Sequence, residues 1–86
     1  MSQSIITVTV KLFAAYQEAY QVSELILELP DGTPVSAVCD RLIAQHSELA
    51  QWREITRFGI NLNFVPPETP LQNGDEVVLI PPVSGG

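Results

Sequence analysis

The sequence predicts an α+β fold in which a mixed sheet of four to five strands packs against one main helix. Apolar residues alternate with polar ones in segments near both ends of the chain, which is typical of strands. Between these segments, apolar residues recur every three to four positions, which is typical of a helix. A chain of 86 residues is long enough for one domain with a single core, and no repeat or linker divides it.

The first strand is predicted over residues 5–13. Its polar face carries two threonines and a lysine, and its apolar face carries Ile6, Val8, Val10 and Leu12. Phe13 is out of phase with the apolar face, so it either points with the polar residues or marks the end of the strand. Residues 14–22 are ambiguous, and a short helical turn is one interpretation.

The next predicted elements are a strand over residues 24–29 and the main helix. Alternating leucines form one face of this strand, which pairs with the first as a broad hairpin and ends in a turn over residues 30–32. Thr33 is predicted to cap the helix, with Pro34 at its first position. The helix is expected to end between His46 and Trp52. Its apolar stripe consists of Val35, Val38, Cys39, Leu42 and Ile43, and its outward residues are Arg41, Gln45 and Glu48.

Two strands are predicted in the last third of the domain. The first covers residues 57–65, and its core face is predicted to carry Phe58, Ile60, Leu62 and Phe64. After a proline-rich loop and an Asn-Gly turn, residues 76–80 form a strand that is apolar almost throughout. Such a strand is either buried on both faces or faces a partner. If it lies beside the first strand, parallel to it and in the middle of the sheet, the element order gives the ubiquitin-like β-grasp.

Composition excludes several classes of function. The net charge is −6, and the only cations are Lys11, Arg41, Arg53 and Arg57, so there is no basic face for nucleic acid. The acidity favours docking on basic partner surfaces, although it equally serves solubility. The chain has no apolar run of about 20 residues and no signal-peptide pattern, so a cytoplasmic protein without membrane association is expected. Cys39 is the only cysteine, which rules out an internal disulfide.

Side chains suited to catalysis are scarce. His46 is the only histidine and is interpreted as a surface or capping residue near the helix end, while Cys39 is interpreted as a core residue. Asp75 and Glu76 are adjacent in a strand and point to opposite faces, so they are assigned to a turn rather than to acid–base chemistry. No metal site is expected.

The functional segment is predicted to be the tail of residues 81–86, which follows a β-grasp domain of residues 1–80. Pro81 and Pro82 end the sheet and favour an extended exit. Val83 and Ser84 extend the reach, so that the six residues span at most ~20 Å. Gly85 and Gly86 lack side chains and can pass through a narrow channel in another protein.

The terminal carboxylate of Gly86 is ionised at neutral pH and is a poor electrophile. It needs activation, for example adenylation by ATP on a partner enzyme. A sulfur donor then displaces AMP and leaves a thiocarboxylate. On this hypothesis, the protein is a carrier whose reactive group is its own C-terminus.

Three segments resemble the small subunits of molybdopterin synthase, a family of ubiquitin-like β-grasp sulfur carriers. These segments are Val10–Ala14, Pro70–Val77 and Pro81–Gly86. The resemblance implies that a ubiquitin-activator-like enzyme adenylates Gly86, that the thiocarboxylate follows, and that the tail enters the large synthase subunit. There, cyclic pyranopterin monophosphate receives the sulfur. The family assembles two small and two large subunits.

The resemblance also has implications for cofactors and catalysis. ATP and a sulfur donor act through the activating enzyme, and no cofactor is bound permanently. The chain itself is then a non-catalytic subunit that serves as a sulfur-carrying co-substrate. Residues 17–19 lack the Arg-Glu-Leu often found in the family at this place, which leaves the role of that loop open.

The resemblance further implies a docking surface made of Phe13, Phe64 and Ile80. The phase of Phe13 agrees with this role independently, and Ile80 adjoins the tail. Phe64 is in phase with the predicted core set, and core packing is an equal alternative for all three residues. Three other functions stay open: a sulfur carrier of the thiamine pathway, a carrier for another thiolation, and a β-grasp interaction module with an inert tail.

Overall fold

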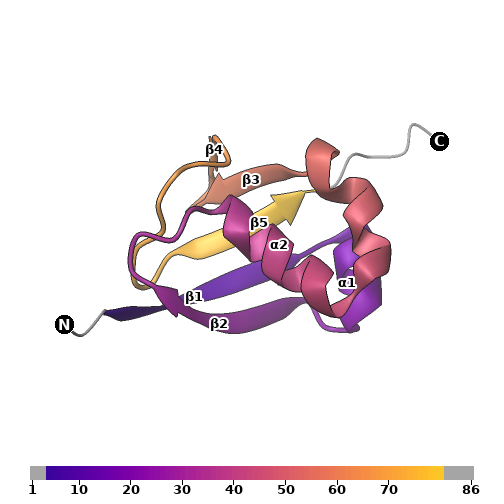
Figure 1. Ribbon diagram of the computed structural model, residues 1–86, viewed down its shortest axis with the longest axis horizontal. Coiled ribbons are helices and arrows are strands. Elements are labelled where there is room, and N and C mark those ends of the chain that lie inside the picture. The colour runs from indigo at the N-terminus through magenta and orange to yellow at the C-terminus, as the bar shows by residue number, and fades with distance from the viewer. Residues whose placement is uncertain (1–3, 81–86) are drawn as a thin grey trace.

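The computed structural model describes residues 4–80, which form one five-stranded sheet with α2 lying across one face (Figure 1). The strand order is β2-β1-β5-β3-β4, which is the predicted mixed sheet packed on one main helix. The elements are β1 (Ile5–Leu12), α1 (Ala14–Tyr20), β2 (Glu24–Pro30), α2 (Ser36–Gln45), the 3₁₀ helix η1 (Ser47–Ile55), β3 (Arg57–Ile60), β4 (Asn63–Val65) and β5 (Glu76–Ile80).

The predicted hairpin of the first two strands is confirmed. β1 and β2 pair antiparallel from Ile5↔Pro30 to Lys11↔Glu24, and α1 forms the connection between them. The predicted apolar face of β1 is buried throughout, with no residue more than 4% exposed. Residues 14–22, which the sequence left ambiguous, thus contain the helix α1, and this helix contributes the fully buried Tyr16 to the core.

β5 occupies the middle of the sheet and runs parallel to β1, as predicted. Val77 and Leu79 are 0% exposed and pack in the core between β1 and β3. Val78 and Ile80 lie on the other face of the strand and are only partly buried. Of the two interpretations of this apolar strand, burial on both faces is therefore wrong, and a face that is free for a partner remains.

The prediction of one strand over residues 57–65 is wrong, because the chain turns back at Asn61 and Leu62. Both residues have positive φ, 51° and 74°, as in a two-residue hairpin turn, and β3 and β4 pair around them. Such a turn reverses the phase of the alternation, because residues directly opposite each other point to the same face. Val65 consequently packs against the core, while Leu62 and Phe64 are 90% and 72% exposed.

Asn61 fixes this turn to the start of β5. Its backbone N–H donates to the carbonyl of Glu76 at 2.9 Å, and its side-chain oxygen accepts from the Glu76 N–H at 3.0 Å. Its side-chain amide also donates to Asp75 at 3.0 Å. These bonds explain why the reversal occurs here although the sequence contains no Asn-Gly or Asp-Gly pair at this point.

The helix stripe is confirmed, but its predicted cap is wrong. α2 begins at Ser36, and the Thr33 hydroxyl donates to the Pro30 carbonyl at 2.6 Å instead of accepting from the helix. The Ser36 N–H donates at 3.0 Å to the carbonyl of Pro67, so the proline-rich loop supplies this acceptor. α2 ends at Gln45, just before the predicted range, and η1 follows as a separate helix that the sequence did not reveal.

A buried chain of hydrogen bonds joins α1, α2 and η1. The Thr56 hydroxyl donates to the Trp52 carbonyl at 2.7 Å and accepts from the Tyr16 hydroxyl at 2.6 Å. The Cys39 sulfur lies 3.4 Å from the Tyr16 oxygen and completes the chain. Burial raises the pKa of the Tyr16 phenol above its ordinary 10.0 and that of the Cys39 thiol above 9.0.

Tyr16→Phe is expected to lower the free energy of unfolding by about 1–2 kcal/mol at neutral pH, because buried groups lose a hydrogen-bond partner. The substitution also changes how the free energy of unfolding depends on pH in alkaline solution. A pKa raised by folding gives stability that is complete below the unfolded pKa and is lost as the pH rises above it. Above about pH 10, stability should therefore fall less steeply in Tyr16→Phe than in the wild type.

Urea unfolding at a series of pH values measures both effects. Tyr20→Phe is the matched control, since the Tyr20 hydroxyl is only partly buried and donates to the Leu42 carbonyl at 2.9 Å. Equal alkaline slopes in the wild type and Tyr16→Phe would contradict the prediction.

Candidate functional site

The candidate site lies where β5 ends. The predicted tail follows Ile80 directly, so it leaves from the central strand of the sheet, which β1 and β3 hold on both sides. Its six residues, Pro81, Pro82, Val83, Ser84, Gly85 and Gly86, lie outside the described residues. What the structure establishes is the rigid base of the tail, where Ile80 is paired with Arg57 of β3.

The sheet face opposite α2 brings the three predicted docking residues together. Phe13, which precedes α1, is 49% exposed, Phe64 of β4 is 72% exposed, and Ile80 is partly buried. All three line one hollow of about 430 Å³. We call this surface the outer patch; it consists of Phe13, Leu62, Phe64, Val78 and Ile80 around the hollow.

The core alternative for Phe64 is therefore wrong, since the side chain faces outward. The prediction that Phe13 points away from the core is confirmed. Leu62 and Val78 were not predicted as members of this surface. Val78 was discoverable, because the alternation within β5 places it on the face opposite Val77 and Leu79. Leu62 was missed because residues 57–65 were predicted as one strand, which placed it on the core face.

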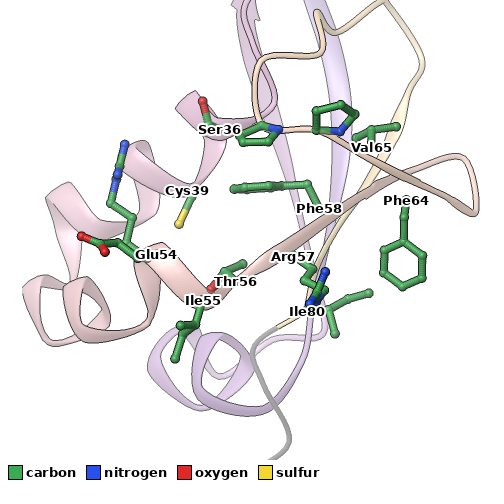
Figure 2. Close-up of a pocket in the computed structure, with 13 residues that line it drawn as sticks. Ser36, Cys39, Glu54, Ile55, Thr56, Arg57, Phe58, Phe64, Val65 and Ile80 are labelled. Atoms are coloured by element: carbon green, nitrogen blue, oxygen red, sulfur yellow. The ribbon is translucent and has the colours of Figure 1, made fainter.

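A larger hollow of about 1030 Å³ adjoins the outer patch (Figure 2). It lies between the start of α2, the end of η1, β3 and the proline-rich loop. Phe64 and Ile80 line both hollows and separate them. Arg57 also lines the larger hollow, and Figure 2 shows it beside Ile80.

The positively charged side chains near this site differ in whether they form ion pairs. Arg53, which also lines the larger hollow, pairs with Asp40, and its guanidinium lowers the pKa of that carboxyl. Lys11, which is paired with Val78 of the outer patch, forms an ion pair with Glu24 at 2.7 Å. Arg57 is exposed, and its side chain makes no ion pair or hydrogen bond to any other residue between 4 and 80.

The side chains that the sequence analysis weighed for catalysis have structural roles. Cys39 is buried, and this burial raises the pKa of its thiol, which disfavours the reactive thiolate. His46 follows the last residue of α2 and stacks edge-on against Tyr20, with ring centroids 4.4 Å apart. Asp75 accepts hydrogen bonds from the Gln72 N–H and the Asn61 amide, so it holds turns.

Between residues 4 and 80, His, Cys, Asp and Glu do not gather in any group of three or more that could hold a metal ion. None of the helices in this range has the length and apolar character needed to cross a membrane. The described residues thus offer a binding surface at the base of the tail.

Comparison with known proteins identifies similar sequences. A model of the ThiS family matches residues 10–86. The molybdopterin synthase sulfur carrier subunit of Chlamydomonas reinhardtii is 36% identical over 81 residues, which cover 92% of this chain and 98% of that protein. The protein of the same name from Arabidopsis thaliana is 30% identical over 83 residues, which cover 96% of this chain and 86% of the relative.

Solved structures share the fold. Small archaeal modifier protein 1 of Methanosarcina acetivorans is 30% identical with a TM-score of 0.75, covering 96% of this chain and 99% of its own. A chain in the complex of subunits 1 and 2 of the molybdopterin-converting factor from Helicobacter pylori matches with a TM-score of 0.64. That match is 22% identical and covers 94% of this chain and 100% of the other.

Proposed function

The chain belongs to the ThiS family, and from this premise we propose that it is the sulfur carrier subunit of molybdopterin synthase in molybdenum cofactor biosynthesis. The observation that carries the proposal is the likeness to three curated carriers of that name, at 30–36% identity over 92–96% of this chain. The outer patch at the base of the tail supports it, because a carrier must dock close to the segment that it delivers.

The proposed cycle uses the terminal carboxylate as the only reactive group of this chain. A carboxylate oxygen of Gly86 attacks the α-phosphorus of ATP on an activating enzyme, and pyrophosphate leaves. A hydrosulfide ion supplied by the sulfur donor then attacks the carbonyl carbon, AMP leaves, and loss of the S–H proton gives a thiocarboxylate. In the large synthase subunit, the sulfur passes to cyclic pyranopterin monophosphate, and the carboxylate is regenerated.

The proposal assigns two partners to this chain in succession. The activating enzyme resembles ubiquitin activators, and the large synthase subunit supplies the pocket that the tail enters. The complex from Helicobacter pylori joins subunits 1 and 2 of a molybdopterin-converting factor, which supports the second partner by fold. We place the cycle in the cytoplasm, with ATP consumed as a substrate and no resident cofactor.

Reconstitution tests the pathway. The carrier charged as the thiocarboxylate is mixed with the large synthase subunit and cyclic pyranopterin monophosphate, and the dithiolene product is quantified. We expect one equivalent of sulfur to be lost from the carrier for each equivalent transferred. Thiocarboxylate consumption by a thiazole-forming enzyme of the thiamine pathway, with none by the synthase, would contradict the assignment.

Protein modification is a second candidate function. It is favoured by the 30% identity to small archaeal modifier protein 1, whose name describes it as a modifier. The same activated Gly86 carbonyl would then be attacked by a lysine amine, with release of AMP or sulfur. Intact-mass analysis of the reaction with a cell extract distinguishes the two candidates, because a modifier forms covalent conjugates and a carrier returns as the free carboxylate.

A further inference from the structure

The floor of the hollow in the outer patch includes a residue without a side chain, which is itself buried. Gly59 of β3 is paired with Val78 of β5 on one side and with Phe64 of β4 on the other. Directly opposed residues point to the same face of a sheet, so two apolar side chains flank an empty position. A Cβ added at Gly59 would lie 3.5 Å from the Asn63 carbonyl oxygen and 3.7 Å from the Val78 Cβ, which is ordinary contact.

A positive charge stands on the same face of the same strand. Arg57 is two residues before Gly59, so both face the outer side of the sheet. The other three cations of the chain are engaged, with Lys11 and Arg53 in ion pairs and Arg41 near the Glu28 carbonyl oxygen at 3.5 Å. In a chain of net charge −6, an exposed cation beside an apolar patch fits a specific anionic group on a partner.

We propose that β3 recognises one segment of the large synthase subunit through both features. An apolar side chain of that segment enters the hollow over Gly59, and an Asp or Glu carboxylate of the same segment pairs with Arg57. Positions two apart in a strand are ~7 Å from each other, so the two partner groups lie at i and i+2 of a strand or about one turn apart on a helix. This inference rests on the proposed function.

We take the large subunit as the occupant because a chain of the same fold occurs in the Helicobacter pylori complex of subunits 1 and 2 of a molybdopterin-converting factor. Leu62 and Phe64 expose 90% and 72% of their surface. Subunit interfaces bury such side chains in a core that contains few charged residues. The carboxylate then fixes the register of docking at the edge of this apolar area.

Charge reversal tests the ionic half of the proposal. Arg57→Glu in the full chain is expected to weaken binding to the large subunit by about tenfold or more, measured by calorimetry at physiological salt. Arg41→Glu is the matched control: it makes the same charge change on α2, which covers the other face of the sheet, and should bind within about twofold of the wild type. Equal weakening by the two variants would overturn the role of Arg57.

Filling the hollow tests the apolar half. Gly59→Ala should raise the Tm by about 2–5 °C, because alanine restricts the unfolded chain and its methyl group fits the free protein. The same methyl group should weaken binding to the large subunit by about threefold or more, because it occupies the space of the partner side chain. A variant that is more stable and binds equally well would overturn the hollow as a receptacle.

Different results would contradict the sulfur-carrier function and the recognition of the large subunit by β3. If the wild-type chain is never converted to a thiocarboxylate or never yields synthase product, the proposed function fails. If the wild type does both, and Arg57→Glu binds the large subunit like Arg41→Glu, only the β3 recognition fails. Loss of adenylation in Arg57→Glu with unchanged synthase binding would instead make the activating enzyme the occupant, which also overturns the inference.

Discussion

Removal of Gly86 is expected to abolish sulfur transfer while leaving the folded domain unchanged. The truncated chain still ends in a glycine carboxylate, but its reactive carbon is ~3.5 Å short of the intact position. A misplacement of about 1 Å in an active site can already reduce a rate by ~10²-fold. Because the core is built from residues 6–79, the truncation should not alter the unfolding transition.

Single-turnover transfer to the pyranopterin precursor measures this effect, with thermal unfolding in parallel. Ser84→Ala is the matched control in the tail: it retains the length and the terminal carboxylate and should keep transfer within a few-fold. Normal transfer by the Gly86 deletion would contradict the assignment of the reactive group, whatever its effect on stability.

The largest effect on stability is expected from Leu79→Ala. Leu79 is 0% exposed in the central strand, paired with Leu12 of β1 and with Phe58 of β3. Truncating a buried leucine costs about 2–5 kcal/mol through lost burial and the cavity left behind. A small domain has a total stability of about 5–15 kcal/mol. The Tm should therefore fall by more than about 10 °C.

Leu62→Ala is the control, because the same chemical change occurs at a residue that is 90% exposed. It should alter stability by less than about 0.5 kcal/mol and should weaken docking, since Leu62 belongs to the outer patch. Urea unfolding separates the two variants. Similar losses of stability in both would mean that β5 is not the centre of the core.

The strands that flank the core could be predicted because their patterns are local. The alternation in β1 places its apolar face in the core without ambiguity. The apolar run of β5 favoured a central position, which is correct, although only Val77 and Leu79 are buried and the other face carries the outer patch. The element order then leaves few topologies in which one helix covers the sheet.

The outer patch could be predicted only in part. A continuous alternation over residues 57–65 looks the same for one strand as for two strands joined by a two-residue turn. The turn at Asn61 and Leu62 reverses the phase, and this reversal moves Phe64 from the core face to the surface. The bonds that hold the turn come from Asp75 and Glu76, which are distant in sequence and leave no local signal.

The predicted cap of α2 was also wrong because of a contact between residues that are distant in sequence. Thr33 followed by Pro34 has the pattern of a helix start, yet the carbonyl that receives the Ser36 N–H belongs to Pro67 of a distant loop. Tertiary contacts thus displace the start of α2 by two residues relative to Pro34. Errors of this size are common where a helix end is satisfied by another segment.

The reactive role of Gly86 is tested most directly by the intact mass of the wild-type chain. The protein is incubated with ATP, a sulfur donor and an activating enzyme, and the C-terminal peptide is then sequenced by fragmentation. We expect a mass gain that corresponds to the exchange of one oxygen for one sulfur, located on Gly86 and dependent on ATP. A mass that never changes, or a sulfur located on Cys39, would contradict the role of the terminal glycine.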